Sequence, residues 1–385
     1  MDLAVEKTTM PRQGEANMYK TMILALGLAV GSGGVAMAQS AWTGGDDLPT
    51  NPLACDGAAG AAASVPYDGG QPTGAPDLKG QKITVVDVPK LIGIGYFNAT
   101  SKGIADAAAE LGSVDAKTDG PTKANIDEQI TFLDNSITSG VNGILFAAND
   151  PVAIAPVLKK ALSKGIHVVG YDANSTPDAR EWFVNQAQFN GIAKSMVDNL
   201  AKESGEEAAF AIVTSTFTTP NQARWIAEMA AYQAKCHPKM KWLETVEAQE
   251  DNVLSFNQAT TLINKYGDEL KGIFGMTSVA TPASAEAVTQ AGKCGSIAVV
   301  GLATPNAMKP YVEKDCVKSV VLWNPVDLGY AAMYVLRAAI DGDLKPGATS
   351  VKAGKLGELQ VINGSEILLG APFTFTKDNI NDFDF

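Results

Sequence analysis

Short apolar runs alternate with amphipathic helical segments along most of the chain. The runs are rich in Val and Ile, and each ends in polar residues or Gly, which is typical of buried strands joined by helices. In the first series we expect strands at 83–88, 114–118, 143–148 and 167–172, with helices at 98–111, 126–139 and 153–163. Consecutive strand-helix-strand units of this kind predict a parallel sheet covered by helices.

The stretch 186–224 closes this first series and opens a second one of the same design. Its expected strands are 208–215, 241–248, 272–276, 297–302 and 317–323, and its expected helices are 221–235, 255–266 and 280–292. We expect a last helix, 327–340, to return to the first series, so that two or three crossings form a hinge. The pattern predicts an α/β protein of two similar doubly wound parallel-sheet lobes joined by a hinge. The N-terminal lobe would hold residues 83–184 plus 325–343, and the C-terminal lobe residues 185–324 plus 344–385.

The N-terminal region has the pattern of a signal peptide over residues 18–38. Tyr19 and Lys20 precede an apolar run at 22–30, and Ala36 and Ala38 are the small residues that a signal peptidase needs. The run is too short to cross a bilayer. We therefore expect cleavage near Ala38 and a periplasmic location. Residues 39–82 are rich in Gly, Ala, Pro and Asp without periodicity, which predicts a tether or a wrapped arm.

Charge and composition limit the possible function. The net charge of −12 argues against a nucleic-acid partner or an anionic membrane surface. His167 and His237 are the only histidines, so the chain has few residues that could form a catalytic triad or a zinc site. Gly93 and Gly95 after the first strand form an incomplete dinucleotide signature. We therefore expect no enzyme activity, cofactor or metal, although a doubly wound fold alone leaves an NAD-dependent enzyme as a less favoured alternative.

The four cysteines permit disulfides in an exported chain. Cys294 and Cys316 stand just before the expected strands 297–302 and 317–323. If these strands are parallel neighbours, the two sulfurs lie at the same end of the sheet, and we predict a disulfide between them. The sequence does not determine how Cys55 and Cys236 pair.

The loops that follow the strands supply the candidate binding residues. In open parallel sheets a ligand binds beyond the carboxyl ends of the strands. Amide and carboxylate groups pair with vicinal hydroxyls, and aromatic faces cover the apolar side of a sugar ring. The alternative roles are helix capping for Asp172 and Asn149 and core packing for Trp323. The pattern favours a small polyol bound between the lobes by Lys90, Tyr96, Phe97, Asn149, Asp172, Asn221, Gln222, Ser278, Trp323 and Asn324.

These loops resemble the autoinducer-2-binding and rhamnose-binding branch of the type I periplasmic sugar-binding proteins of ABC transporters. The resemblance lies in residues 88–97, 118–122, Asp172, 184–186, Gln222 with Trp225, 304–313 and 322–323, and it spans residues 83–385. It implies a monomeric receptor that closes on its ligand and delivers it to an ABC permease in the inner membrane. Sugar-responsive repressors share this core but need a basic helix-turn-helix ahead of it, where this chain has the expected signal peptide.

The autoinducer-2 pattern implies three ligand residues that this chain keeps: a lysine at Lys90, an aspartate at Asp172 and a glutamine at Gln222. Its second aspartate falls on Asn221, and its proline and alanine fall on Met276 and Ser278. The lost carboxylate changes the hydrogen bonding, and the larger Met276 changes the shape of the wall. We therefore expect a sugar or sugar alcohol, with autoinducer-2 as the alternative ligand.

Overall fold

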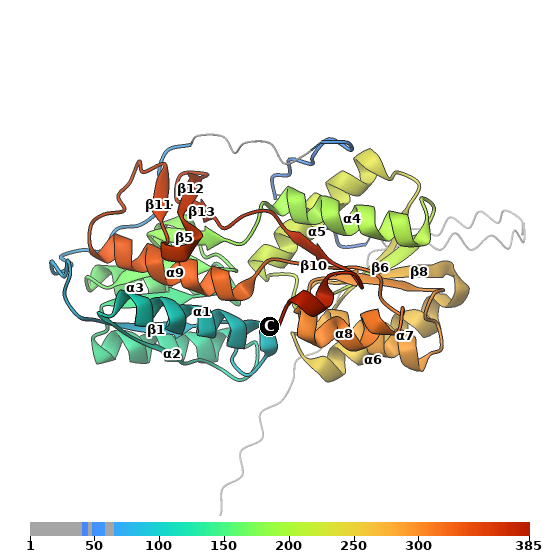
Figure 1. The fold of residues 1–385 in the computed structure, drawn as a ribbon, viewed down its shortest axis with the longest axis horizontal. Helices are drawn as coiled ribbons and strands as arrows, with labels where there is room; N and C mark the ends of the chain where they lie inside the picture. Colours follow the sequence, from blue (N-terminus) through green and yellow to red (C-terminus); the bar gives the residue numbers. More distant parts are fainter. Residues whose placement is uncertain (1–40, 45–47, 58–64) are drawn as a thin grey trace, which may run out of the picture. The chain divides into compact units, whose positions relative to one another are not determined.

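The computed structural model describes residues 41–44, 48–57 and 65–385, so the expected signal peptide at 18–38 lies outside the described residues. Within residues 40–385 the chain forms two α/β lobes, each with its own sheet (Figure 1). The predicted fold class is thereby confirmed. Among the described helices, none combines the length and the apolar character that crossing a bilayer requires.

The first lobe is built on an eight-stranded sheet in the order β11-β12-β13-β5-β4-β3-β1-β2. All neighbours from β13 to β2 pair in parallel, and β11, β12 and β13 form an antiparallel meander at one edge. The strands are β1 (Ile83–Val88), β2 (Val114–Thr118), β3 (Gly143–Phe146), β4 (His167–Tyr171), β5 (Trp182–Asn185), β11 (Ser350–Lys352), β12 (Glu358–Ile362) and β13 (Glu366–Leu368).

Helices cover both faces of this sheet (Figure 1). α1 (Gly95–Leu111) and α9 (Pro325–Ile340) pack on one face, and α2 (Ile126–Ser139) and α3 (Ala155–Ser163) pack on the other. β1 serves both layers, because Val85 joins the first apolar cluster and Val86 joins the second. A strand that is buried on both faces carries apolar side chains on both.

Close packing of α1 on α9 brings the last long helix back to the first lobe. Gly103 of α1 and Gly329 of α9 lie at the contact, and a Cβ on either one would overlap a carbonyl group of the other helix, at Val326 and Thr100 respectively. The two backbones can therefore approach this closely only where neither residue has a side chain.

The second lobe has a parallel four-stranded sheet in the order β7-β6-β8-β9. α4 and α5 lie on one face and α6 and α7 on the other (Figure 1). A two-stranded antiparallel ribbon, β10 with β14, continues this sheet through a bridge between Leu302 and Val321. The elements are α4 (Phe189–Ser204), β6 (Ala209–Thr214), α5 (Pro220–Cys236), β7 (Lys241–Glu247), α6 (Asn252–Tyr266), β8 (Leu270–Gly275), α7 (Ala280–Gln290), β9 (Ala298–Gly301), α8 (Pro305–Glu313), β10 (Val320–Leu322) and β14 (Phe373–Phe375).

The end of the chain departs from the expected division. Residues 344–385 were expected in the C-terminal lobe, but β11, β12 and β13 belong to the sheet of the first lobe. Parallel pairing of β13 with β5 draws the meander to that sheet, and β5 was itself not among the predicted strands. Only β14 and the short 3-10 helix Ile380–Asp382 return to the second lobe. The described chain thus passes between the sheets at residues 186–188, 323–324 and 369–372.

The arm ahead of β1 is bound to both lobes. On the second lobe, Trp42 stacks on Phe217 with ring centroids 4.3 Å apart, and the backbone N–H of Asn51 donates to both carboxylate oxygens of Glu228 at 3.1 Å. On the first lobe, the hydroxyl of Tyr67 donates to the carbonyl of Glu181 at 2.9 Å. The described parts of the arm contain no helix or strand, so side chains and single backbone bonds hold it in place.

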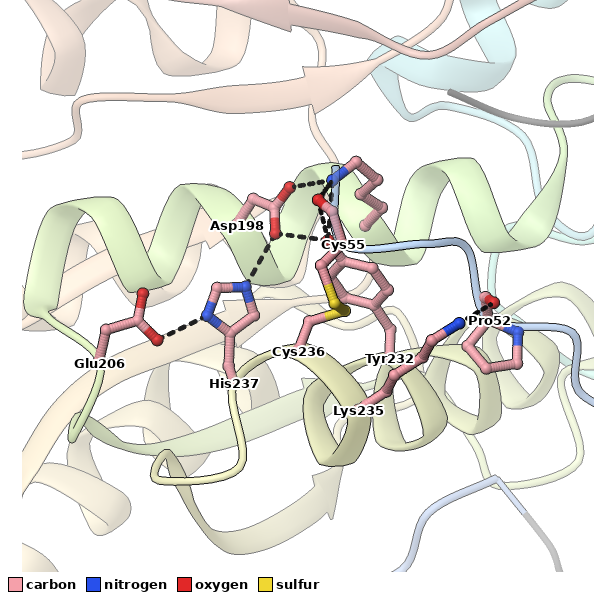
Figure 2. Close-up of a disulfide and its surroundings, with 9 residues drawn as sticks. Pro52, Cys55, Asp198, Glu206, Tyr232, Lys235, Cys236 and His237 are labelled. Carbon is pink, nitrogen blue, oxygen red and sulfur yellow. Dashed lines mark hydrogen bonds and ion pairs between the residues drawn. A yellow bond between two sulfur atoms is a disulfide. The ribbon is translucent and has the colours of Figure 1, made fainter. Parts of the chain in front are cut away.

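Two disulfides are present, Cys294–Cys316 and Cys55–Cys236. The second ties the arm to the C-terminal end of α5 (Figure 2). Around it, His237 lies between Asp198 and Glu206, with nitrogen to oxygen distances of 2.9 and 2.8 Å, and Lys235 donates to the carbonyl of Pro52 (Figure 2). The arm is thus held covalently at Cys55 and by a hydrogen bond from Lys235 at Pro52, whereas the His237 contacts join the end of α5 to Asp198 of α4 and to Glu206.

Removing the arm disulfide should lower the melting temperature more than removing the other one. Cys55–Cys236 joins residues 181 apart, against 22 for Cys294–Cys316, and the longer loop restricts the unfolded chain more. We expect the Cys55→Ser/Cys236→Ser variant to lose about 2–4 kcal/mol of unfolding free energy. Thermal unfolding of both double-serine variants measures the difference. An equal or smaller loss in the arm variant would show that the arm detaches without affecting the lobes.

Candidate functional site

A cavity of about 30 Å³ lies where the strand ends of the two lobes meet. Its walls come from loops after β1, β4, β7, β8, β9 and β10 and from the first turns of α1 and α5. Polar, aromatic and aliphatic side chains line it. The lining residues are Lys90, Ile94, Tyr96, Phe97, Asp172, Asn221, Gln222, Trp225, Glu250, Met276, Thr277, Ser278, Leu302, Leu322 and Trp323.

A buried cluster of three charges joins the lobes. The Lys90 ammonium lies 2.5 Å from Oε1 of Glu250 and 3.9 Å from Oδ2 of Asp172, and all three residues are at most 6% exposed. Burial opposes the charge on Lys90, but Glu250 and Asp172 together raise its pKa above the usual value. Burial raises the pKa of Asp172 to about 6, although Lys90 opposes this shift. Buried charges of this kind persist only when they are paired.

A chain of hydrogen bonds fixes the Asp172 carboxylate. Asp172 has a left-handed backbone (φ 59°) at the end of β4, and its Oδ1 accepts from the hydroxyl of Tyr96 at 2.9 Å and from the amide of Asn221 at 3.4 Å. The Tyr96 hydroxyl in turn accepts from the indole of Trp323 at 2.9 Å. A carboxylate held from two sides keeps a constant position for a ligand.

Gln222 is held in one orientation by the strand end of β6. Its Oε1 accepts from the hydroxyl of Thr214 at 2.5 Å and from the backbone N–H of Ser215 at 2.8 Å. The amide Nε2 therefore faces the cavity, where it donates to Oε1 of Glu250 at 3.1 Å. Beside it, the rings of Trp225 and Trp323 lie 5.7 Å apart at 49° and form an apolar wall. Together these groups offer donors, acceptors and aromatic surface to one small molecule.

Eight of the ten expected binding residues line the cavity: Lys90, Tyr96, Phe97, Asp172, Asn221, Gln222, Ser278 and Trp323. Asn149 and Asn324 do not. The Asn149 side chain donates to the carbonyl of Lys90 and to Gln129, so it positions the Lys90 loop from behind. The Asn324 side chain accepts from the N–H of Val326 and caps α9. Asparagine at a strand end often serves the backbone in this way.

Glu250 lines the cavity but is not among the residues expected from the sequence. The rule that ligands bind beyond the carboxyl ends of strands applies equally to the loop after β7, residues 248–251, which holds Glu250. Trp225 was named from the sequence only as a residue that the chain shares with the sugar-binding family it resembles. It follows Asn221 and Gln222 by four and three positions on α5, so the helical repeat puts all three on one face.

Comparisons with known proteins identify the family of the chain. Residues 85–344 match the family model of the periplasmic binding protein domain, so the chain belongs to that family. It is 28% identical over 261 residues to the D-allose-binding periplasmic protein of Escherichia coli (strain K12), a match that covers 65% of this chain and 82% of that protein. The family is one of binding proteins, which supports a binding role in place of an enzymatic one.

Two solved structures extend the comparison. An ABC transporter solute-binding protein from Clostridium phytofermentas with bound L-rhamnose is 28% identical, with a TM-score of 0.75 over 78% of this chain and 98% of that one. LsrB from Clostridium saccharobutylicum in complex with AI-2 is 22% identical, with a TM-score of 0.74 over 79% of this chain and all of the other (100%). At that identity the second likeness concerns the fold alone.

Proposed function

We propose that this protein is a periplasmic solute-binding protein of an ABC importer, which binds a small sugar or sugar alcohol in the interlobe cavity and delivers it to a permease. The observation that carries the proposal is the cavity itself, where polar groups of both lobes converge beside the Trp225 and Trp323 rings. The names of the relatives support it, because D-allose and L-rhamnose are small neutral sugars.

Binding and closure would be coupled by contacts between the lobes. Lys90 and Asp172 of the first lobe contact Glu250 and Asn221 of the second. A sugar hydroxyl both donates and accepts, so it can enter such a pair and bond to both lobes at once. A ligand held by both lobes stabilises the arrangement in which they are close together. That arrangement is the one a permease would distinguish from the open form.

Autoinducer-2 remains the second candidate ligand, because Lys90, Asp172 and Gln222 all line the cavity. Asn221, however, already donates to the carboxylate of Asp172. An amide at this position cannot supply the second carboxylate of the autoinducer-2 pattern. Met276 and Ser278 also line the cavity, where that pattern has proline and alanine. These departures favour a pentose, deoxyhexose or alditol.

A ligand screen by thermal unfolding tests the proposal. At a hundredfold excess over its Kd, a ligand that binds only the folded state adds about 2.7 kcal/mol, enough to raise Tm by several degrees. We expect at least one pentose, hexose, deoxyhexose or alditol to do so, and calorimetry should then show tighter binding of that sugar than of autoinducer-2. No shift with any carbohydrate would contradict a sugar receptor, and a shift with NAD alone would favour an enzyme.

A further inference from the structure

The cavity wall contains two buried polar atoms that lack a partner among the described residues. They are Oε2 of Glu250 and the indole Nε1 of Trp225, in side chains of residues that are 6% and 2% exposed. Both residues line the cavity. The other oxygen of Glu250 accepts from Lys90 and from Gln222, so the carboxylate is held on one side and free on the other. A buried polar atom without a partner is destabilising, and a site that keeps two of them is adapted to groups that a ligand brings.

The loop that carries Glu250 has an unfavourable backbone. Gln249 and Glu250 both adopt left-handed conformations, with φ of 53° and 52°, which residues with a Cβ rarely do. Bonds from the N–H of Ala248 to the carbonyl of Thr214 and from the N–H of Gln249 to that of Ser215 tie the loop to the end of β6. Such conformations persist where the surroundings impose them, and they are concentrated at functional sites.

The charges in the wall restrict what can bind there. Among the described residues that line the cavity, Lys90 is the single cation, whereas Asp172 and Glu250 are both carboxylates. A carboxylate oxygen accepts hydrogen bonds and an indole N–H donates one. The free groups therefore suit a hydroxyl that donates to Glu250 and an oxygen that accepts from Trp225. A ligand carboxylate would add a third negative charge to a buried site that holds one cation.

We propose that Glu250 and Trp225 are ligand-binding residues, and that Glu250 makes the site select uncharged sugars over sugar acids. This inference rests on the proposed function, since it concerns the same cavity. Glu250, which carries the discrimination by charge, belongs to the second lobe. It is not one of the three residues that the chain shares with the autoinducer-2 pattern.

The wild-type protein provides the first test. Calorimetry would compare neutral probes, D-allose, L-rhamnose and D-fucose, with acidic ones, L-rhamnonate and D-galacturonate. D-fucose and D-galacturonate differ by a methyl and a carboxylate group on the same ring, so this pair isolates the effect of charge. We expect the best neutral sugar to bind at least about a hundredfold more tightly than either acid. A sugar acid bound as tightly as the best neutral sugar would overturn the inference even if no variant could be purified.

Conservative substitutions provide the second test. Glu250→Gln keeps the shape and removes the charge, and it should weaken the best neutral sugar about ten- to a hundredfold and narrow its advantage over the acids about tenfold. Trp225→Phe keeps the ring and removes the N–H, with an expected loss of about three- to tenfold. The matched controls lie outside the cavity lining: Glu228→Gln, a buried carboxylate bonded to Asn51, and Trp242→Phe, whose indole bonds to Thr245. Both controls should bind as the wild type does.

The outcomes separate the inference from the proposed function. Tight sugar binding by the wild type with unchanged affinity in Glu250→Gln and Trp225→Phe overturns the inference and leaves the sugar receptor intact. Absence of binding by the wild type to every sugar overturns both. Equal losses in the cavity variants and in the controls would point to general destabilisation, which also contradicts a specific role, and melting temperatures of the free proteins would show it directly.

Discussion

Replacing Lys90 by methionine should abolish sugar binding and destabilise the protein by about 3–5 kcal/mol, because it leaves buried carboxylates without their cation. Methionine approximates the length of the lysine stem and removes the ammonium group, which lies 5.7 Å from the centroid of the Phe97 ring, so the charge is the main change. The remaining pair, Glu250 and Asp172, would repel each other in a buried site. Loss of charge-assisted bonds to the ligand should lower the affinity by more than about tenfold for each bond.

Urea unfolding and calorimetry measure the two effects. Adding Glu250→Gln to the Lys90→Met variant should restore part of the stability, since one uncompensated charge is removed, but not the binding. Lys194→Met is the control, because Lys194 pairs with Asp198 at a more exposed position, where a pair contributes at most about 1 kcal/mol. Sugar binding by Lys90→Met within a few-fold of the wild type would mean that the ion pair is structural and the ligand lies elsewhere.

The hydrophobic pattern predicted the elements best where local signals were complete. The ranges 83–88, 114–118 and 126–139 match β1, β2 and α2 residue for residue. α2 shows why: the Asn125 side chain caps its start, and it ends at Gly140 in the left-handed conformation. Both signals can be read in the sequence without knowledge of the rest of the fold.

Elements whose position depends on distant partners were harder to predict. β5 is four residues long and is defined by its pairing with β4 and β13, and β13 lies about 180 residues further along the chain. The meander of β11, β12 and β13 could join an edge of either sheet, and nothing in its own residues identifies which. α4 was a different case, because Ile192, Met196 and Leu200 repeat at helical spacing and lie buried, so its signal was available.

The same distinction applies to the site. Most of the candidate residues, which were chosen because they follow the carboxyl ends of strands, line one cavity. Parallel strands end at the same edge of a sheet whatever their order. The Lys90–Glu250 pair joins residues 160 positions apart in different lobes, and its existence depends on how the lobes meet. Sequence spacing therefore predicted most of the loops that line the cavity but not which charges pair across it.

The stability of the protein should rise as the pH falls from 8 to 5, and Asp87 should be a main cause. Asp87 of β1 is fully buried, and burial raises its pKa to about 7, although the hydroxyls of Tyr171 and Thr118 donate to it and oppose the shift. An unfolded aspartate titrates near 3.9, so between about pH 4 and 7 the folded state holds a proton that the unfolded state has released. In that range the unfolding free energy falls as the pH rises.

Between pH 5 and 8 we expect Asp87 to lower the unfolding free energy by roughly 2–3 kcal/mol. The change is about 1.4 kcal/mol for each pH unit in which the folded and unfolded states differ by one bound proton. Burial raises the pKa of Glu203 to about 7 and that of Asp172 to about 6, and both add to the same trend. Asp87→Asn should therefore be more stable than the wild type at pH 8 and should lose part of the slope. Urea unfolding at several pH values measures this, with Asp127→Asn on the exposed first turn of α2 as the control. An unchanged slope in Asp87→Asn would show that Asp87 keeps its charge in the folded core, stabilised by its two hydroxyl donors.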